Sequence, residues 1–335
     1  MRTISSEQLG LGVDIGGTKI ATGLVDPAGT LLKSSRKPTP ADDPKALLEV
    51  LIAEIRAFAD EYPVESVGIA AAGFVNAARS TVMFAPNIAW RDENLKEPVE
   101  QATGLPVVVE NDANAAGWAE FQFGGGRDAE DLVLLTLGTG LGGAIIAEGE
   151  LLRGGFGMAA ELGHLRLVPN GILCGCGNRG CWEKYTSGSA LTASAQQLAA
   201  ANSPEAERFR AAIGAEGDDI TGELVSKAAA QGNREAAELL AGLGEWLGVG
   251  IAQLAAVLDP SLVVIGGGLS EVGELLLKPA RDALREHLPA RAKRPELALS
   301  VATLGGDAGM IGAADLGLLA SRGSGVGRGA GSSAG

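Results

Sequence analysis

Short apolar segments that end in glycine alternate along this chain with longer segments of helical periodicity. Residues 11–15, 20–26 and 30–34 have the composition of three successive strands, with a tight turn at 26–29. Asp43-Pro44 then predicts the start of a helix, because aspartate is a favoured N-cap and proline is tolerated in the first turn. The apolar positions that follow recur at helical spacing: Leu47, Leu48, Leu51, Ile55 and Phe58.

The same pattern then continues and restarts. Residues 64–71 and 106–110 read as buried strands, with a helix around 93–103 between them that stops at Gly104. Residues 131–137, 142–147 and 150–153 again read as strands, and 13–18 resembles 135–140 in having a strand, a glycine turn and a second strand. We therefore expect a weak internal duplication, in which two α/β halves each present a glycine turn to a cleft between them.

The second half is rich in helices. Helical spacing predicts helices over 187–201, 222–230 and 234–258, and the last ends at Asp259-Pro260, a pair that disfavours further helix. A buried strand at 261–265, a helix at 272–287, a strand at 297–303 and a final helix at 306–319 follow. Residues 321–335 are rich in glycine and serine, which predicts a flexible tail.

Length and charge narrow the classes of function. The chain has 335 residues, enough for two domains, and its net charge of −14 argues against a nucleic-acid or membrane partner. The apolar run 67–75 is far shorter than a membrane span, and residues 1–9 lack the apolar core of a secretory signal. We therefore expect a cytoplasmic protein.

Two glycine turns are candidates for binding a phosphorylated ligand. Asp14-Ile15-Gly16-Gly17-Thr18-Lys19 could direct backbone N–H groups at a phosphate while Asp14 faces its magnesium ion. An ordinary hairpin explains this segment alone equally well, but Gly138-Thr139-Gly140-Leu141-Gly142-Gly143 repeats the pattern and favours a binding role. A third run, Gly266-Gly267-Gly268, would suit adenine or ribose, although by itself a plain strand-to-helix turn is the better explanation.

The clustering of cysteines predicts a structural zinc site. His164, Cys174, Cys176 and Cys181 form a Cys₃His set, and every cysteine of the chain belongs to it. Three buried cysteines beside a core histidine are the alternative, which this clustering disfavours. Because four protein ligands leave no open position, the metal is expected to fix the flanking Glu161 and Glu183 rather than activate water.

A carboxylate at a strand end is the candidate general base. Asp112 follows a buried strand and opens a helix, so it is either a helix N-cap or a base that takes a proton from a sugar hydroxyl as that hydroxyl attacks a phosphoryl group. The residue types alone leave both explanations open.

These motifs together resemble the ROK family, named for repressors, open reading frames and sugar kinases. The resemblance extends from Leu11 to about Ala320 and includes both glycine turns and the Glu161-x-Gly-His164 and Cys174-x-Cys176-x₄-Cys181-x-Glu183 signature. It implies an actin/hexokinase-like (ribonuclease H-like) α/β fold, with duplicated domains around a closing cleft. We expect a smaller domain at 1–115, completed by a helix at 306–320, and a larger one at 116–305 that carries the zinc motif.

The resemblance is greatest to the glucose-specific kinases of actinobacterial type. It implies ATP-dependent phosphorylation of glucose to glucose 6-phosphate with Mg²⁺, with Asp112 as base. It further implies that Asn111, Asp112, Glu161, His164 and Glu183 contact the sugar, that the glycine motifs bind ATP, and that the protein is a homo-oligomer, a dimer or a tetramer. Some members of the family also accept polyphosphate as donor.

Three other functions compete with this one. The same carboxylates would serve mannose, fructose or an N-acetylated hexosamine. A sugar-responsive repressor of the family needs a DNA-reading module, and the 13 residues before Asp14 are too few for one. A non-catalytic sugar-binding protein would be excluded by turnover of ATP with sugar.

Overall fold

The computed structural model describes residues 8–323, which belong to two compact units. Within these residues the first unit comprises 8–133, 144–160 and 302–323, and the second comprises Leu134–Gly143 and Glu161–Val301. The predicted limit at residue 115 falls inside helix α3 (Asp112–Gln122), which packs against α10 (Ala308–Ser321) within the first unit. The division into domains at 115 and 116 stays a prediction.

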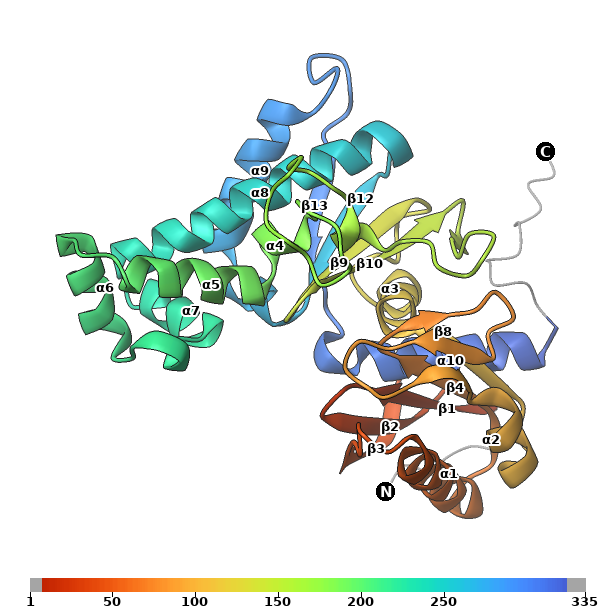
Figure 1. The fold of residues 1–335 in the computed structure, drawn as a ribbon. Helices are drawn as coiled ribbons and strands as arrows, with labels where there is room; N and C mark the ends of the chain where they lie inside the picture. The colour runs from red at the N-terminus through yellow and green to blue at the C-terminus, as the bar shows by residue number, and fades with distance from the viewer. Residues whose placement is uncertain (1–7, 324–335) are drawn as a thin grey trace. The chain divides into compact units, whose positions relative to one another are not determined.

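The first unit contains a five-stranded sheet (Figure 1). Its strands run in the order β3 (Leu31–Pro38), β2 (Lys19–Val25), β1 (Leu9–Ile15), β4 (Val64–Ala71) and β8 (Val107–Asn111). β2 is antiparallel to both of its neighbours, whereas β4 is parallel to β1 and to β8. The carboxyl ends of β1, β4 and β8 therefore lie at one edge, with Asp14 and Glu110 both opposite Ala70.

Helices cover both faces of this sheet. Figure 1 shows α1 (Pro44–Glu61) and α2 (Lys96–Thr103) on one side and α10 on the other. Asp43 caps α1 as predicted, since its side chain accepts hydrogen bonds from the N–H groups of Lys45 and Ala46. α10 lies directly on the strands: a Cβ on Gly12 would come within 1.8 Å of the Met310 carbonyl oxygen. Only glycine allows so close an approach.

A small antiparallel sheet in the first unit was not predicted. It consists of β5 (Phe74–Val75), β6 (Thr81–Phe84) and β7 (Arg91–Asn94). The helix predicted around 93–103 is wrong at its start, because residues 91–94 pair with β6 and α2 begins at Lys96. Its predicted end is correct, since Gly104 terminates α2 in the left-handed conformation with φ 73°.

A second five-stranded sheet repeats the strand order of the first. Its strands run in the order β11 (Glu150–Leu151), β10 (Leu141–Ala147), β9 (Leu132–Leu137), β12 (Leu262–Gly266) and β13 (Ala298–Val301). In both sheets the third strand of the repeat lies at one edge, followed by the second, the first, the fourth and the fifth. This order confirms the predicted duplication of an α/β unit, and the limit between the two compact units passes within β9 and β10.

The helices of the second unit include two with the predicted bounds, 222–230 and 234–258. The α-helices of this unit are α4 (Glu183–Thr186), α5 (Gly188–Ala199), α6 (Pro204–Ile213), α7 (Gly222–Ala230), α8 (Arg234–Leu258) and α9 (Glu274–His287). Helix α6 was not predicted, and α9 begins two residues later than expected. α8 packs closely along α9, since a Cβ on Gly248 would lie 2.2 Å from the Ala280 carbonyl oxygen.

Helix α8 also bears on the question of a membrane. Among residues 8–323 it is the one helix long and apolar enough to cross a bilayer by length and composition, and 56% of its most apolar window is buried inside the structure. A core helix passes the same test, and the packing of α8 on α9 accounts for its apolar character.

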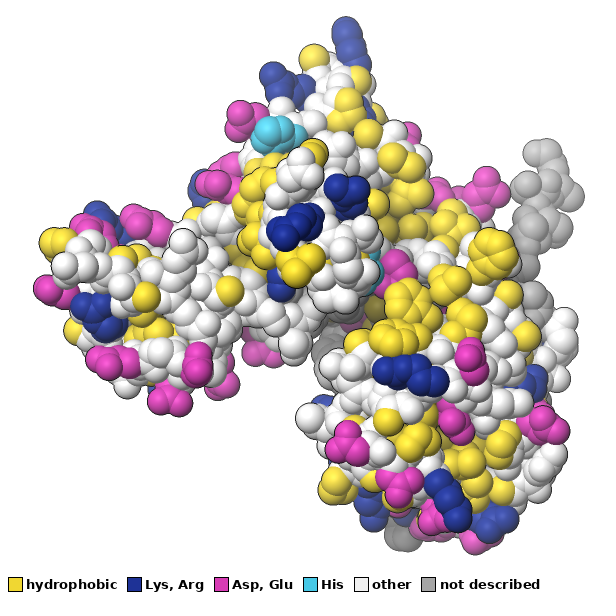
Figure 2. All heavy atoms as spheres, viewed as in Figure 1, with side chains coloured by type: hydrophobic (Ala, Val, Ile, Leu, Met, Phe, Trp, Pro, Cys, Tyr) yellow, Lys and Arg dark blue, Asp and Glu magenta, His cyan; other side chains and the backbone are white. Residues whose placement is uncertain are grey.

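Figure 2 shows acidic and basic side chains interspersed on the visible face of each unit, with no continuous basic surface there.

The carboxyl-terminal limit of the last helix differs from the prediction. α10 continues through Ser321, so the predicted tail 321–335 starts too early. Residues 324–335 of that segment lie outside the described residues.

Candidate functional site

The first glycine turn joins β1 to β2. The Gly16 N–H donates to the Lys19 carbonyl (3.0 Å), and the Thr39 hydroxyl donates to the Gly16 carbonyl (2.7 Å). Thr18 and Lys19 are exposed. A Cβ on Gly17 would lie 3.0 Å from the Cβ of Asn87, so a side chain here would be crowded. The segment is thus a closed hairpin turn that also leaves a hydroxyl and an ammonium group accessible to a ligand.

Asp14 lies at the carboxyl end of β1, against the first turn of α10. Its Oδ2 atom is 2.7 Å from the position that a Cβ on Gly309 would occupy. Burial, and next the negative charge of Asp112, raise the pKa of Asp14 to about 7, while Lys19 lowers it. A carboxyl group held in this state gains strongly from a bound cation, which restores its ionised form.

Asp112 opens helix α3, but it is not the residue that caps this helix. Asn111 is the N-cap: its Oδ1 accepts the Asn114 N–H (3.0 Å), and its Nδ2 donates to the Gly73 carbonyl (3.1 Å). Asp112 Oδ1 accepts the adjacent Ala113 N–H at 2.9 Å. The interpretation of Asp112 as a helix cap is therefore wrong, because its neighbour takes that role.

The environment of Asp112 suits a proton acceptor. Burial raises the pKa of its carboxyl group, and hydrogen bonds from the Ala113 and Asp112 backbone and from Asn111 oppose that change. A raised pKa makes a carboxylate a better base, provided that it is ionised at the working pH. Asp14 and Asp112 thus form a pair of interacting carboxyl groups in the first unit.

The predicted zinc ligands come together in the second unit. One potential ligand atom from each of His164, Cys174, Cys176 and Cys181 lies within 4.8 Å of the others. The Cys176 and Cys181 sulfurs are 3.6 Å apart, and the Cys174 sulfur is 3.7 Å from His164 Nδ1. Ligands about 2.3 Å from a tetrahedral zinc ion would be about 3.8 Å apart, so the four side chains fit such an ion.

Backbone contacts bring this loop beside the second glycine turn. Residues Leu162–His164 form a single 3₁₀ turn, and a Cβ on Gly163 would lie 2.2 Å from the Leu141 carbonyl oxygen. Glu183, the first residue of α4, approaches Cys174, with 3.0 Å between Oε1 and Sγ. Its Oε2 is 3.1 Å from where a Cβ on Gly140 would be. Glu161 is exposed at the start of the loop.

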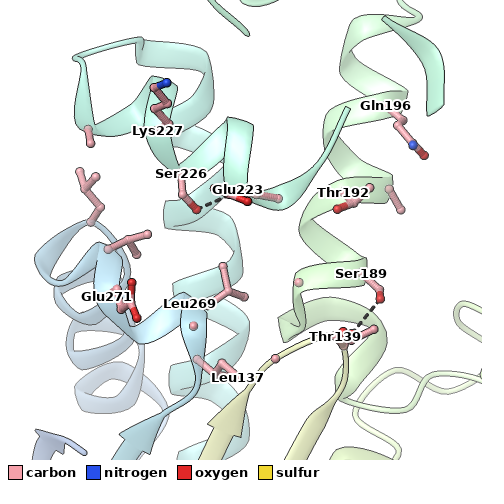
Figure 3. Close-up of a pocket in the computed structure, with 18 residues that line it drawn as sticks. Leu137, Thr139, Ser189, Thr192, Gln196, Glu223, Ser226, Lys227, Leu269 and Glu271 are labelled. Carbon is pink, nitrogen blue, oxygen red and sulfur yellow. Dashed lines mark hydrogen bonds between the residues drawn. The ribbon is translucent and has the colours of Figure 1, made fainter. Parts of the chain in front are cut away.

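A pocket of about 990 Å³ opens at the second glycine turn (Figure 3). The Gly138 carbonyl accepts the Gly188 N–H (2.8 Å), and the Thr139 carbonyl accepts the Ser189 hydroxyl (2.7 Å), so the turn is fixed to the start of α5. Figure 3 shows Leu137 and Thr139 at one end of the pocket and Gln196 and Lys227 at the other. This volume is at the upper end of the range for small-molecule sites, about 300–1,000 Å³.

Only some residues of the second and third glycine motifs line this pocket. Gly138, Thr139 and Gly268 do, whereas Gly140, Gly142, Gly143, Gly266 and Gly267 are not among the lining residues. Gly267 has a structural requirement instead, with φ 82° and a Cβ position 2.5 Å from the Leu137 carbonyl oxygen.

Most of the pocket wall was missed by the sequence motifs. Its side chains come from α5, α7, the turn that precedes α9 and the start of α9, and they combine apolar and polar groups. They include Thr192, Gln196, Glu223, Ser226, Lys227, Leu269, Glu271, Val272 and Leu275. One face of α5 and of α7 that is polar at helical spacing was the available signal, but a solvated surface has the same pattern.

Most of the chain is similar to known proteins of one family. The model of the ROK family matches residues 10–319. A glucokinase of Streptomyces coelicolor is 49% identical over 308 residues, which are 92% of this chain and 97% of that protein.

Solved structures give the same result. A ROK family glucokinase from Streptomyces griseus, in complex with glucose and AMPPNP, has a TM-score of 0.82 and 48% identity, over 92% of this chain and 99% of that one. A ROK hexokinase from Thermus thermophilus has a TM-score of 0.79 and 32% identity, over 95% of this chain and all of that one.

Proposed function

Because this chain belongs to the ROK family, we propose that it is an ATP-dependent glucokinase, which converts glucose to glucose 6-phosphate. The relatives named glucokinase support this activity, and the glucose and AMPPNP bound to the Streptomyces griseus enzyme support both substrates. The observation in this chain that carries the proposal is the placement of Asp112. It is a half-buried carboxylate at the start of α3, with a raised pKa and no duty as helix cap.

In this reaction the 6-hydroxyl oxygen of glucose attacks the γ-phosphorus of ATP. The oxygen–phosphorus bond to ADP breaks, ADP leaves, and Asp112 takes the hydroxyl proton. Such a transfer depends chiefly on alignment of the two substrates and on compensation of phosphate charge. Asp112 would accept the proton, and the side chains that bind the sugar would align its 6-hydroxyl with ATP.

The sugar hydroxyls would be bound by five side chains. Asn111 would offer an amide N–H besides the one that Gly73 accepts. Glu161 and Glu183 would accept from hydroxyl groups. His164 would use Nε2, because Nδ1 is the nitrogen that faces the Cys174 sulfur. Asp112 itself completes this set.

The ATP site would extend along the pocket at the second glycine turn. Gly138 and Thr139 would lie by the phosphates, and the apolar wall with Leu269 and Val272 would receive the adenosine, passing Gly268. Asp14, Gly16, Gly17, Thr18 and Lys19 would act on the phosphate end. Burial raises the pKa of Asp14, and the Mg²⁺ that accompanies ATP would stabilise its ionised carboxylate. Roles for Gly140, Gly142, Gly143, Gly266 and Gly267 would be to shape these turns.

A structural zinc ion fits the cysteine cluster by its ligand types and spacing. His164, Cys174, Cys176 and Cys181 would hold it, and it would fix the loop that carries Glu161 and Glu183. Its contribution would be to the positions of these groups, since four protein ligands fill a tetrahedral zinc site.

The experiment that tests this proposal is a sugar and donor panel. Purified protein would be assayed with glucose, mannose, fructose, N-acetylglucosamine and N-acetylmannosamine, with ATP or polyphosphate as donor. We expect the highest kcat/KM for glucose with ATP, because a site built around particular hydroxyls rejects their analogues strongly. A higher kcat/KM for another sugar would overturn the specificity, and absence of turnover with every sugar would overturn the activity. A cytoplasmic location and a homo-oligomeric state stay predictions.

A further inference from the structure

We infer that Glu110 is a positioning residue for Asp112, held in place by Arg79 and Arg153; this inference rests on the proposed function. These three side chains, the Glu110 cluster, lie within the first unit. Glu110 precedes the Asn111-Asp112 pair, and its side chain is 1% exposed. Its Oε2 is 2.9 Å from a terminal nitrogen of Arg79 and 2.8 Å from Nε of Arg153.

The other oxygen of Glu110 holds the start of helix α3. Oε1 accepts the Asn111 backbone N–H at 2.9 Å and the Asn114 side-chain amide at 3.1 Å. Asn114 in turn donates its backbone N–H to the Asn111 cap. A single carboxylate oxygen therefore ties together the residue before Asp112 and a residue two positions after it. Any movement of Glu110 would be transmitted to both sides of the base.

The arginines fix Glu110 to two other segments. Arg79 stands in the turn between β5 and β6 with φ 56°, an uncommon value for a residue with a side chain, and its carbonyl accepts the Val109 N–H at 3.0 Å. Arg153 donates to the carbonyls of Asn76 (3.0 Å) and Ala77 (3.1 Å) in the same turn. The cluster thus joins β8, this turn and the segment after β11.

Stability alone does not account for this arrangement. Two guanidinium groups, each 14% exposed, face one carboxylate, so the cluster carries a net positive charge in a buried position. Buried ion pairs contribute little net stability compared with apolar side chains of similar size, because each charge must leave water. What the cluster supplies is a fixed position for the Glu110 carboxylate, whose Oε1 accepts the hydrogen bonds from residues on either side of Asp112.

The test compares two buried glutamates of the first unit. Glu110→Gln keeps an oxygen that can accept from Asn111 but removes the charge that the arginines face. Glu120→Gln is the matched control, because Glu120 is also 1% exposed and binds the Gly125, Thr303 and Leu304 N–H groups near the other end of α3. For each variant, Tm, kcat and the KM values for glucose and ATP would be measured.

We expect Glu110→Gln to lower kcat at least tenfold while KM for ATP changes less than threefold. Both variants should lower Tm by similar amounts, but Glu120→Gln should keep kcat within twofold of wild type. Equal effects of both variants on kcat, or a kcat within twofold of wild type for Glu110→Gln, would overturn the inference.

A second variant covers the case in which Glu110→Gln does not fold. Arg153→Met leaves Glu110 with one arginine, so the pair is neutral, and we expect a kcat loss of at least threefold with little change in KM for ATP. A kcat equal to that of wild type would overturn the inference here as well. Wild-type turnover in the same assay tests the proposed function separately, since the inference concerns only ratios of variant to wild type.

Discussion

Asp112 lies close enough to Asp14 for its negative charge to raise the pKa of Asp14, second only to the effect of burial. The two groups belong to different elements, the end of β1 and the start of α3. Without a cation, ionisation of both is unfavourable, so the pair is costly to the free protein and useful only when a positive charge is near. Natural proteins keep such local conflicts chiefly at functional sites.

The first prediction concerns the pH dependence of stability. Asp14 has a pKa of about 7 in the folded protein, raised from 3.8, so its ionisation destabilises the fold. This penalty is absent well below pH 3.8, grows as pH rises, and is complete above about pH 7. The Asp14→Asn variant lacks the penalty. We therefore expect its Tm, relative to wild type, to increase between pH 5 and pH 8, measured without nucleotide or divalent cation.

Saturating Mg²⁺ and ATP provide the control for this measurement. They should stabilise wild type more than Asp14→Asn at pH 8, because a ligand stabilises the folded protein more when it binds more tightly. A Tm difference between the two proteins that does not vary with pH would contradict the account of Asp14.

The second prediction concerns the general base. Asp112→Asn should fold normally and bind glucose, because the carboxamide keeps the shape of the side chain. Its kcat should fall by about 10²–10⁴-fold, the usual contribution of general-base catalysis. Steady-state kinetics would be compared with calorimetric binding of glucose. Retention of more than about a third of wild-type kcat would show that Asp112 is not the base.

The third prediction separates binding from structure among the glycines. A Cβ on Gly138 meets no atom within 4 Å, and Gly138 lines the pocket. Gly138→Val should therefore leave Tm nearly unchanged but raise KM for ATP several-fold. Gly267→Ala should instead lower Tm, because φ is 82° and its Cβ would lie 2.5 Å from the Leu137 carbonyl oxygen. Normal ATP kinetics in Gly138→Val would place the nucleotide elsewhere.

The fourth prediction concerns the cysteine cluster. Purified protein should contain about one zinc ion per chain, and Cys176→Ser should lower that content, because a serine hydroxyl is a poor substitute for thiolate. KM for glucose should rise, since Glu183 approaches Cys174 directly, whereas KM for ATP should change less. Fully active protein without metal would contradict the zinc site. Normal glucose kinetics in a metal-depleted Cys176→Ser variant would contradict only the coupling.

Residues with strong local signals were the ones that sequence could place. Asp43-Pro44 fixes the start of α1, and the apolar repeat of α8 defines a helix whose bounds are as predicted. By contrast, residues 91–94 are all polar, so nothing in their pattern distinguishes strand β7 from the helix that follows it. The strand becomes stable through pairing with β6, a contact that local sequence does not encode.

The candidate site divides in a similar way. Motif spacing predicted the grouping of His164 with the cysteines, because metal geometry restricts which ligands can meet. Gln196 and Lys227 lie on helix faces, and they are recognised as pocket residues only once α5 and α7 are placed together in the fold. Asn111 illustrates a finer limit: adjacent Asn and Asp are equally good caps, and only the structure shows which one takes the role.

The most direct test of the central claim is to follow phosphorus through a complete reaction. Wild-type protein would be incubated with equimolar glucose, ATP and Mg²⁺, and the products identified by ³¹P nuclear magnetic resonance. The account predicts one glucose 6-phosphate for each ADP formed, with no release of inorganic phosphate above the level without protein. Conversion of ATP to ADP and free phosphate, or a sugar phosphate esterified at a position other than oxygen 6, would contradict it.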